Sequence, residues 1–347
     1  AGVPESDGAS KTSSTVSVKR GSDRATGPLS FDRSVSARPA AAIQPVELAE
    51  AMLQREGVEG CILAGALGDA LGGVYEGKPG PVQIDPNASL RISDDTQITL
   101  ATCEAILESP AAEPEVVAEA FVRWFRARRI TGMGSSTLKA LRDLAAGGHW
   151  ALAGAMGERS AGNGAAMRIA PLAFVATPST DAGRTRIRDT ARITHRNDAA
   201  YVGALAVIVA IQIAFRSGLQ HLPGLVADSL PDSLVRDRLR ELTSLSDEPT
   251  SIEIAARFGS SAYVVESVPL AIYAAQRAER DGLERMLYGV IEAGGDTDSN
   301  ASIAGQIAGA CLGAGQVPSE LLEKIPEVSS IRDVAKRFAN HLYPPTS

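Results

Sequence analysis

The stretch that decides the fold is Gly60-Cys-Ile-Leu-Ala-Gly-Ala-Leu-Gly-Asp-Ala-Leu-Gly72. Its small residues Gly60, Ala64, Gly68 and Gly72 recur every four positions, which places them on one stripe of a helix. Glycine inside a helix costs about 1 kcal/mol relative to alanine. A chain that accepts this cost repeatedly needs another helix, or a ligand, against the stripe. The segment therefore predicts a close approach along one helix face.

The composition also favours packed helices. Hydrophobic residues make up 44% of the 347 positions but aromatic residues only 4%, and an interior poor in large rings must be built from closely approaching backbones. No stretch shows the alternation of apolar and polar residues typical of strands, so we predict a compact all-α domain of many helices. The net charge of -7 argues against a nucleic-acid partner, because proteins that bind the phosphate backbone usually carry a basic face.

Apolar spacing predicts where the other helices lie. We expect helices over residues 93–108, 114–128, 137–146, 185–194, 199–215, 233–245, 252–258, 264–279, 283–292 and 301–312, and a loop over 219–230. The most apolar of these segments, residues 199–215, is shorter than the roughly 20 apolar residues of a typical membrane span. It is predicted to be a buried helix, and no membrane contact is expected.

The first 45 residues differ from the rest of the chain. They are rich in Ser, Ala, Gly, Thr and Arg and show neither helical nor alternating periodicity. Such a segment cannot bury enough apolar area to offset its ordering entropy. We predict a flexible N-terminal arm over residues 1–45 and one folded domain over residues 46–347. The arm is either a solvated tail or a segment that orders on a partner.

The cysteines bear on the compartment. Cys61, Cys103 and Cys311 are far apart and form no Cys-x-x-Cys pair, which argues against a disulfide framework or a thiolate zinc site. The first forty residues contain no continuous apolar segment of the kind found in signal peptides. We therefore expect a reducing, cytoplasmic location.

Two acidic clusters at expected helix starts predict a metal site. The first is Ser93-Asp94-Asp95-Thr96; the second contains Asp296 and Asp298, with Ser299 beside them and two glycines before them. Hard cations such as Mg²⁺ and Mn²⁺ prefer oxygen ligands, and a two-metal site places its ions about 4 Å apart. Each cluster alone could simply cap its helix. The pair favours a hard-metal site.

Two further polar positions fit an extended ligand. The loop Gly162-Asn163-Gly164 can present backbone N–H groups to phosphate oxygens, although it could also be a simple turn. His195 lies at a break between two apolar helices, where a histidine could bind a ligand or serve as a structural hydrogen bonder. Spacing alone does not decide between these interpretations.

Taken together, the motifs resemble one known family. Residues 60–72, 93–97, 162–168, 194–195 and 294–301 match, in order and spacing, the ADP-ribosylglycohydrolase family from about residue 57 to 315. The resemblance implies a compact all-α domain with two divalent cations, Mg²⁺ or Mn²⁺, that removes ADP-ribose from modified targets.

The resemblance also implies roles for individual residues. The metal ligands would be Ser93, Asp94, Asp95, Asp296, Asp298 and Ser299, with Asp298 bridging the two ions. Glu76, in the matching Tyr75-Glu76 element, would lie near the metals and the scissile bond. The catalytic candidates are thus Glu76, Asp95 and Asp296. Gly162, Asn163, Gly164 and His195 would bind substrate, and we favour a structural role for Asp69.

Three positions depart from the family pattern. Ser93 and Ser299 stand where many members have threonine, so a hydroxyl is retained. Gly132 stands where nitrogenase-regulating members carry an aspartate assigned to catalysis. The identity of the base and the target linkage therefore stay open at this point.

The expected function is metal-dependent removal of ADP-ribose from modified protein side chains. N-linked ADP-ribosylarginine is preferred as the linkage because it is prevalent in the family. The alternative is an immunity or inhibitor protein that binds a cognate ADP-ribosylating toxin through residues 1–45, with or without hydrolysis. Some bacterial immunity members of the family have N-terminal extensions of this kind.

Overall fold

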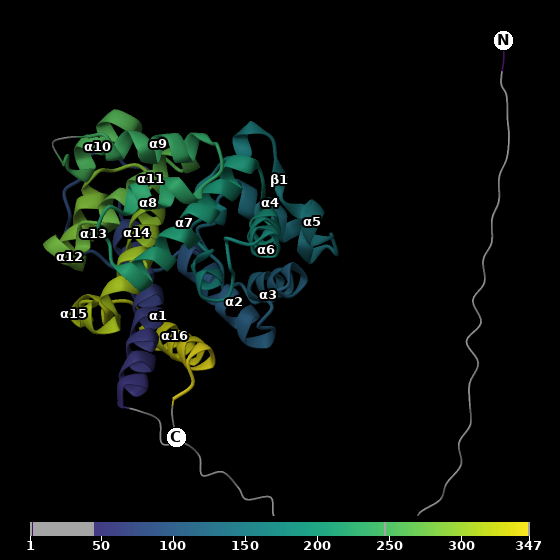
Figure 1. Cartoon of the computed structure of the whole chain (residues 1–347), viewed down its shortest axis with the longest axis horizontal. Helices are drawn as coiled ribbons and strands as arrows, with labels where there is room; N and C mark the ends of the chain where they lie inside the picture. Colours follow the sequence, from purple (N-terminus) through teal and green to yellow (C-terminus); the bar gives the residue numbers. More distant parts are fainter. Residues whose placement is uncertain (1, 3–44, 246–247, 346–347) are drawn as a thin grey trace, which may run out of the picture. The chain divides into compact units, whose positions relative to one another are not determined.

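The structure, a computed structural model, describes Gly2 and residues 45–245 and 248–345. These residues form sixteen α-helices, four short 3-10 helices and two strands of two residues each (Figure 1). The predicted all-α class is confirmed. The predicted arm over residues 1–45 lies outside the described residues, apart from Gly2 and Pro45.

A pair of closely packed helices forms the centre of the fold. They are α1, Pro45–Gly72, and α14, Thr297–Leu312. A Cβ atom placed on Gly68 would lie 2.2 Å from the carbonyl oxygen of Ala301. A Cβ atom on Gly309 would in turn lie 2.2 Å from the carbonyl oxygen of Gly60. The small-residue stripe therefore faces a second helix, which decides between the two alternatives that the sequence left open.

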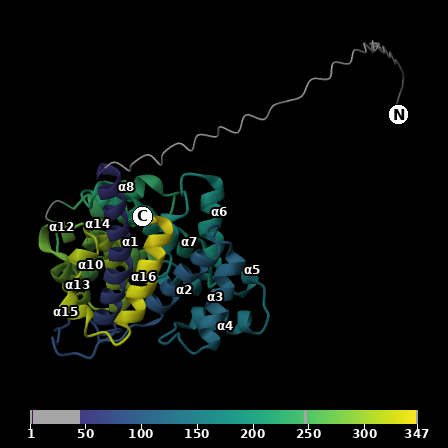
Figure 2. The ribbon, with the colours of Figure 1, turned by 90° about the horizontal axis from the view of Figure 1, so that it is seen from below.

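The remaining elements surround this pair, and Figure 2 shows α16 beside α1. Their bounds are α2 Asp94–Glu108, α3 Pro114–Arg126, α4 Ser135–Ala145, α5 Trp150–Ala153, α6 Asp181–Arg192, α7 Asp198–Ser217, α8 Leu222–Ser229, α9 Leu234–Thr243, α10 Ser251–Phe258, α11 Val264–Ala275, α12 Ala278–Asp281, α13 Leu283–Glu292, α15 Ser319–Leu322 and α16 Val328–Leu342. The strands β1, Ala155–Met156, and β2, His195–Arg196, pair in parallel, with Ala155 opposite His195.

Helix α7 is the apolar segment that was predicted to be buried. Among the described residues it is the one helix that is long and apolar enough, by length and composition, to cross a membrane. Within the fold, 67% of its most apolar window is buried. It packs against α6, α8, α11 and α14, which is the environment of a core helix.

One predicted loop is a helix in the structure. Residues 222–229 form α8, whereas a loop was expected over 219–230. Pro223 lies in the first turn of α8, where the N–H that proline lacks has no partner inside the helix, so the residue that suggested a loop is compatible with a helix start. The loop prediction was therefore wrong.

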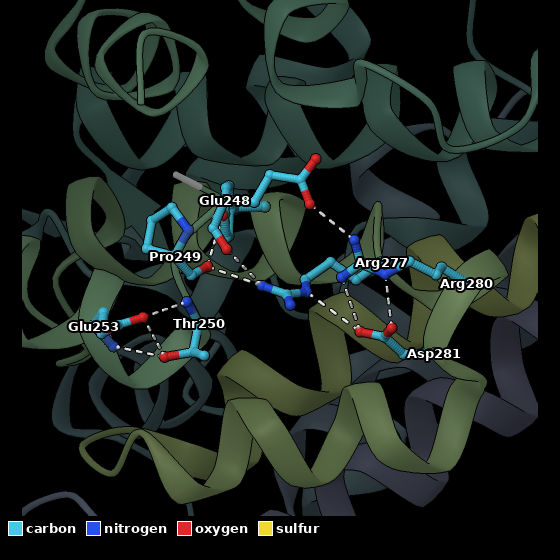
Figure 3. Close-up of polar contacts among 8 residues, drawn as sticks. Glu248, Pro249, Thr250, Glu253, Arg277, Arg280 and Asp281 are labelled. Atoms are coloured by element: carbon cyan, nitrogen blue, oxygen red, sulfur yellow. Dashed lines mark hydrogen bonds and ion pairs between the residues drawn. The ribbon is translucent and has the colours of Figure 1, made fainter. Parts of the chain in front are cut away.

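Two arginines fasten the segment that leads into α10 (Figure 3). Arg277 donates a hydrogen bond to the carbonyl oxygen of Pro249 at 2.8 Å, and Arg280 pairs with Glu248 at 2.8 Å. Both arginines also contact Asp281. The Arg280–Glu248 pair is largely exposed, so it contributes little to the free energy of unfolding.

Candidate metal and substrate site

The first acidic helix start is fixed by a buried aspartate on α1. Asp69 is fully buried, and its carboxylate accepts hydrogen bonds from the backbone N–H of Ser93 at 3.0 Å and of Thr96 at 3.1 Å. The Thr96 hydroxyl donates to it as well. Ser93 caps α2 by accepting a hydrogen bond from the backbone N–H of Asp95 at 3.2 Å. Asp69 thus attaches the first turn of α2 to α1, which agrees with a structural role.

The second acidic helix start depends on two glycines. Gly294 and Gly295 have φ angles of +73° and +82°, a region that residues with side chains rarely adopt. A Cβ atom on Gly294 would lie 2.3 Å from the backbone nitrogen of Gly80, and one on Gly295 would lie 2.4 Å from the carbonyl oxygen of Ser260. The same carbonyl accepts a hydrogen bond from the backbone N–H of Asp296 at 2.9 Å. The glycines therefore let two loops reach the start of α14.

Five carboxylates lie close together around the two helix starts. Asp69, Asp95 and Asp298 form one group whose nearest oxygens lie within 4.8 Å of one another, and Glu76, Asp296 and Asp298 form a second. Asp298 belongs to both groups. Such clusters of oxygen donors are the chemistry that hard divalent cations select.

Burial gives this cluster unusual proton affinity. Asp95 is 1% exposed, and burial together with the charge of Asp298 raises its pKa well above the usual range. Burial and the charge of Asp296 raise the pKa of Asp298 to about 8. Burial and the charge of Asp69 raise the pKa of Asp94 to about 7. Buried carboxylates repel one another, so a nearby cation would stabilise them. The donor set therefore fits divalent metal ions.

The two serines occupy different positions. The Ser299 hydroxyl donates to both carboxylate oxygens of Asp95 at 3.1 Å and so joins the two helix starts. The Ser93 hydroxyl caps α2. Asp94 belongs to neither carboxylate group and lies next to Gly132, where a Cβ atom would be 3.6 Å from Asp94 Oδ1.

The predicted phosphate loop is attached to the acidic cluster. The Asn163 side-chain amide donates to Asp296 at 2.6 Å, and its backbone N–H donates to the carbonyl oxygen of Ala262 at 2.9 Å. Gly162 forms an isolated β-bridge with Tyr263. The loop and the start of α14 are therefore one connected unit.

A buried relay orients His195. Arg168 donates to the Thr194 hydroxyl at 2.7 Å, and that hydroxyl lies 2.9 Å from His195 Nδ1. The Thr194 hydroxyl has no other acceptor among the described residues, so its proton is assigned to Nδ1, which leaves the hydrogen of the neutral ring on Nε2. Burial and the charge of Arg168 lower the pKa of His195 to about 3. His195 is thus a neutral donor, and Gly164 passes so close that a Cβ atom there would lie 2.7 Å from Cε1.

The predicted residues thus fall into a connected set and a border. Short distances or hydrogen bonds link six of them: Glu76, Asp95, Asp296, Asp298, Ser299 and Asn163. Gly162, Gly164 and His195 adjoin Asn163, while Ser93 and Asp94 lie at the start of α2. Sequence reasoning missed Thr194 and Arg168 as the groups that orient His195. A charged residue inside the apolar segment that follows the loop was the available signal for Arg168.

Comparison with known proteins agrees with this arrangement. The sequence model of the ADP-ribosylglycohydrolase family matches residues 50–346. This chain belongs to that family. The resemblance predicted from about residue 57 to 315 is therefore confirmed. As an ADP-ribosylglycohydrolase, the chain is a hydrolase that acts on ADP-ribose glycosidic bonds.

Several relatives match this ADP-ribosylglycohydrolase over most of their length. An uncharacterized protein of Archaeoglobus fulgidus is 32% identical over 80% of this chain and 94% of its own. The human ADP-ribosylhydrolase ARH3 is 26% identical over 75% of this chain and 86% of its own. The ADP-ribosylarginine hydrolase Tri1 of Pseudomonas putida is 25% identical over 81% and 77%, respectively.

A solved structure has the same fold. A chain of an ADP-ribosylglycohydrolase-related protein complex aligns with a TM-score of 0.64 at 25% identity, covering 85% of this chain and 100% of that one. The structural match thus extends over most of this chain.

Proposed function

We propose that this ADP-ribosylglycohydrolase removes ADP-ribose from modified protein side chains, with N-linked ADP-ribosylarginine as the preferred linkage, and that it requires two divalent cations, Mg²⁺ or Mn²⁺. The observation that carries the proposal is the sharing of Asp298 by two groups of carboxylates. A carboxylate common to two groups is the natural bridge of a two-metal site.

The donor set suggests how the cations would be held. Asp95 and Asp298 would serve one ion, and Asp296 and Asp298 the other, with Glu76 beside this second pair. The wider ligand set also includes Ser93, Asp94 and Ser299. Bound cations would hold the ribose hydroxyls in place and would supply an activated water for hydrolysis.

The loop beside the carboxylates would bind the diphosphate of the substrate. The backbone N–H groups around Gly162 and Gly164 and the Nε2–H of His195 offer donors for phosphate oxygens. Because His195 is held neutral, it presents one fixed donor without adding a positive charge. Asn163 links the loop to Asp296, so substrate bound there would lie next to the carboxylates.

Glu76 is the preferred group for proton transfer. It is exposed, whereas Asp95 is buried. Partial desolvation and the charge of Asp296 nevertheless raise the pKa of Glu76. A carboxylate with a raised pKa at the border of a site can exchange protons with water and with a leaving group. Asp95 and Asp296 are the other candidates, but both would already be engaged with cations.

Arginine as the linkage is supported by the name of one relative, the ADP-ribosylarginine hydrolase Tri1. The relatives named ARH3 are ADP-ribosylhydrolases whose names specify no linkage. A serine linkage is therefore the principal competitor, and a direct comparison of substrates is needed.

The test is a hydrolysis panel of arginine-, serine- and nucleic-acid-linked ADP-ribose, each with Mg²⁺, Mn²⁺ or EDTA. The proposal expects release of ADP-ribose from the arginine-linked substrate, dependent on the metal, and lost in Asp298→Asn. Faster release from serine would replace the proposed linkage. Full activity in EDTA would show that hydrolysis does not require divalent cations.

The alternative function concerns residues 1–45, which precede the family match. Binding of a cognate ADP-ribosylating toxin through this segment stays a prediction, as does the cytoplasmic location. Comparing the full chain with a variant that lacks residues 1–44 tests it. Unchanged protection against such a toxin, with unchanged hydrolysis, would leave the segment without this role.

A further inference from the structure

A separate cavity of about 500 Å³ lies between α2, the end of α3 and the start of α16. Its walls include Arg91, Arg128 and Arg129, together with Trp124 and the carboxylate of Glu327. It shares none of the carboxylates of the candidate metal site. Its volume falls within the range of small-molecule pockets.

The three arginines are not neutralised by neighbours. Within the part of the chain that the structure describes, none of them forms an ion pair or donates a side-chain hydrogen bond. By contrast, Arg123 on α3 pairs with Glu108. In a chain with a net charge of -7, three unpaired guanidinium groups around one cavity form a local excess of positive charge. Guanidinium groups bind phosphate oxygens in a bidentate manner.

Two of these arginines are positioned before any ligand arrives. The Arg129 guanidinium lies 3.4 Å from the ring centre of Trp124, whose indole N–H donates to Glu104 at 2.7 Å. Arg128 has a φ angle of +56°, which a residue with a side chain rarely adopts. The turn is closed by hydrogen bonds from the backbone N–H of Arg128 to Phe125 and of Arg129 to Trp124, each 3.0 Å long. These two hydrogen bonds are the pattern of a helix C-terminal cap, which fixes the backbone of Arg128 and Arg129 beside the cavity.

One wall of the cavity is formed by Glu327, whose carboxylate has an unsatisfied oxygen. Glu327 Oε2 is buried and accepts no hydrogen bond among the described residues. A buried oxygen without a donor costs free energy unless something else supplies the donor. A ligand that carries an anionic group for the arginines and a hydroxyl for Glu327 would satisfy both sides of the cavity.

We propose that this cavity binds the phosphate group of a small phosphorylated polyol, such as a sugar phosphate. Arg91 and Arg128 would hold the phosphate, and Glu327 would accept a hydrogen bond from a ligand hydroxyl. The neighbouring Thr131 donates its backbone N–H to Gln97 of α2 at 2.7 Å. Gly132 follows and lies against Ser93. The pocket therefore borders the loop that touches the candidate metal site.

The test uses the fluorescence of Trp124. The chain contains two tryptophans, so Trp150→Phe leaves Trp124 as the only indole and makes the signal specific to this cavity. The full chain in this background is titrated with ribose 5-phosphate and, separately, with inorganic phosphate, at constant ionic strength. We expect a saturable change in emission, with tighter binding of ribose 5-phosphate.

Variants separate the roles of the residues. Arg91→Gln combined with Arg128→Gln should weaken binding of both probes by at least about tenfold, because each loses charge-assisted hydrogen bonds. Glu327→Gln should weaken ribose 5-phosphate more than phosphate. The matched control is Arg142→Gln combined with Arg285→Gln, which removes the same charge from exposed arginines outside the cavity. The control should bind as the parent does.

Three results would overturn the proposal. They are no saturable change with either probe, parental affinity in the Arg91/Arg128 double variant, and equal loss in the Arg142/Arg285 control. Equal affinity for both probes would show that no ligand hydroxyl contacts Glu327. If the Trp150→Phe protein does not fold, calorimetric titration of the parent chain and of the same arginine variants measures the same affinities and distinguishes the same outcomes.

Discussion

Ser299 shows how much of the candidate site depends on one hydroxyl. It is the residue of α14 whose side chain donates to both oxygens of Asp95 on α2. It therefore orients a proposed metal ligand, whether or not it also contacts the ion. Groups that orient ligands commonly change metal affinity by 10- to 100-fold when removed.

Substitution of Ser299 tests this role. Ser299→Ala should raise the Mg²⁺ concentration needed for half-maximal activity by about 10-fold or more, because Asp95 loses its donor. Ser299→Thr retains the hydroxyl and should stay close to the parent. The measurement is activity against Mg²⁺ concentration, and equal curves for the alanine and threonine variants would contradict the expectation.

His195 gives a pH-dependent prediction at the same scale. Its folded pKa of about 3 lies below the usual 6.5, so between these values the unfolded chain binds a proton that the folded protein does not. The stability gained from a neutral His195 is thus present above pH 6.5 and lost as the pH falls toward 3.

The variant His195→Gln removes this titration. The difference in free energy of unfolding between parent and variant should shrink by up to about 1.4 kcal/mol for each pH unit below 6.5. Chemical denaturation at several pH values measures it, and only the change with pH matters, because other groups titrate equally in both proteins. A difference that stays constant from pH 7 to 4 would show that folding does not lower the pKa of His195.

At the scale of elements, the α1–α14 contact makes the fold sensitive to single methyl groups. Gly68 faces the Ala301 carbonyl oxygen across the contact, whereas Gly289 in α13 has no heavy atom within 4 Å of where its Cβ would lie. Both glycines are inside helices and differ only in what surrounds them. They are therefore a matched pair.

The two alanine substitutions should have opposite effects. Gly68→Ala should lower the free energy of unfolding by about 1–3 kcal/mol, because the helices must move apart. Gly289→Ala should raise it by about 0.5–1 kcal/mol, because alanine loses less conformational entropy in a helix. Urea denaturation measures both, and a stabilised Gly68→Ala protein would contradict the close contact.

Sequence patterns predicted some of these elements more accurately than others. The bounds of α13 were predicted without error, since its apolar spacing is regular and Gly282 precedes it. Helix α8 was missed because Pro223 and Gly224 suggest a loop when neighbours are unknown. The carboxylates were identifiable as pairs at helix starts, but the contact of Asp69 with α2 and the relay to His195 arise only from tertiary packing, which no local pattern encodes.

At the scale of the whole molecule, the candidate site is assembled from chain segments far apart in sequence. Carboxylate oxygens of Asp95 and Asp298 lie within 4.8 Å of each other, yet the two residues belong to α2 and α14. Cation binding would therefore link distant segments and stabilise the folded protein as a whole.

Thermal unfolding with and without divalent cation tests this linkage. Mg²⁺ or Mn²⁺ should raise the melting temperature, and Asp298→Asn should remove most of that rise because Asp298 belongs to both carboxylate groups. Asp181→Asn is the matched control, since Asp181 also lies in the first turn of a helix, α6, and its loss removes the same charge. A full shift in Asp298→Asn would contradict a shared ligand.

The glycine contact between α1 and α14 has a consequence for ion selectivity. Helix α1 fixes α2 through Asp69 and α14 through backbone contact at Gly68 and Gly72. The separation of the helices that carry Asp95 and Asp298 is thus set by the close backbone contact of α1 with α14 and by the hydrogen bonds of Asp69. Ca²⁺ requires oxygen ligands at about 2.3–2.6 Å, and Mg²⁺ at about 2.0–2.1 Å. If the proposed cations bind here, a fixed separation would discriminate by ionic radius, and enlarging the site for calcium would require moving the helices as well as exchanging carboxylates.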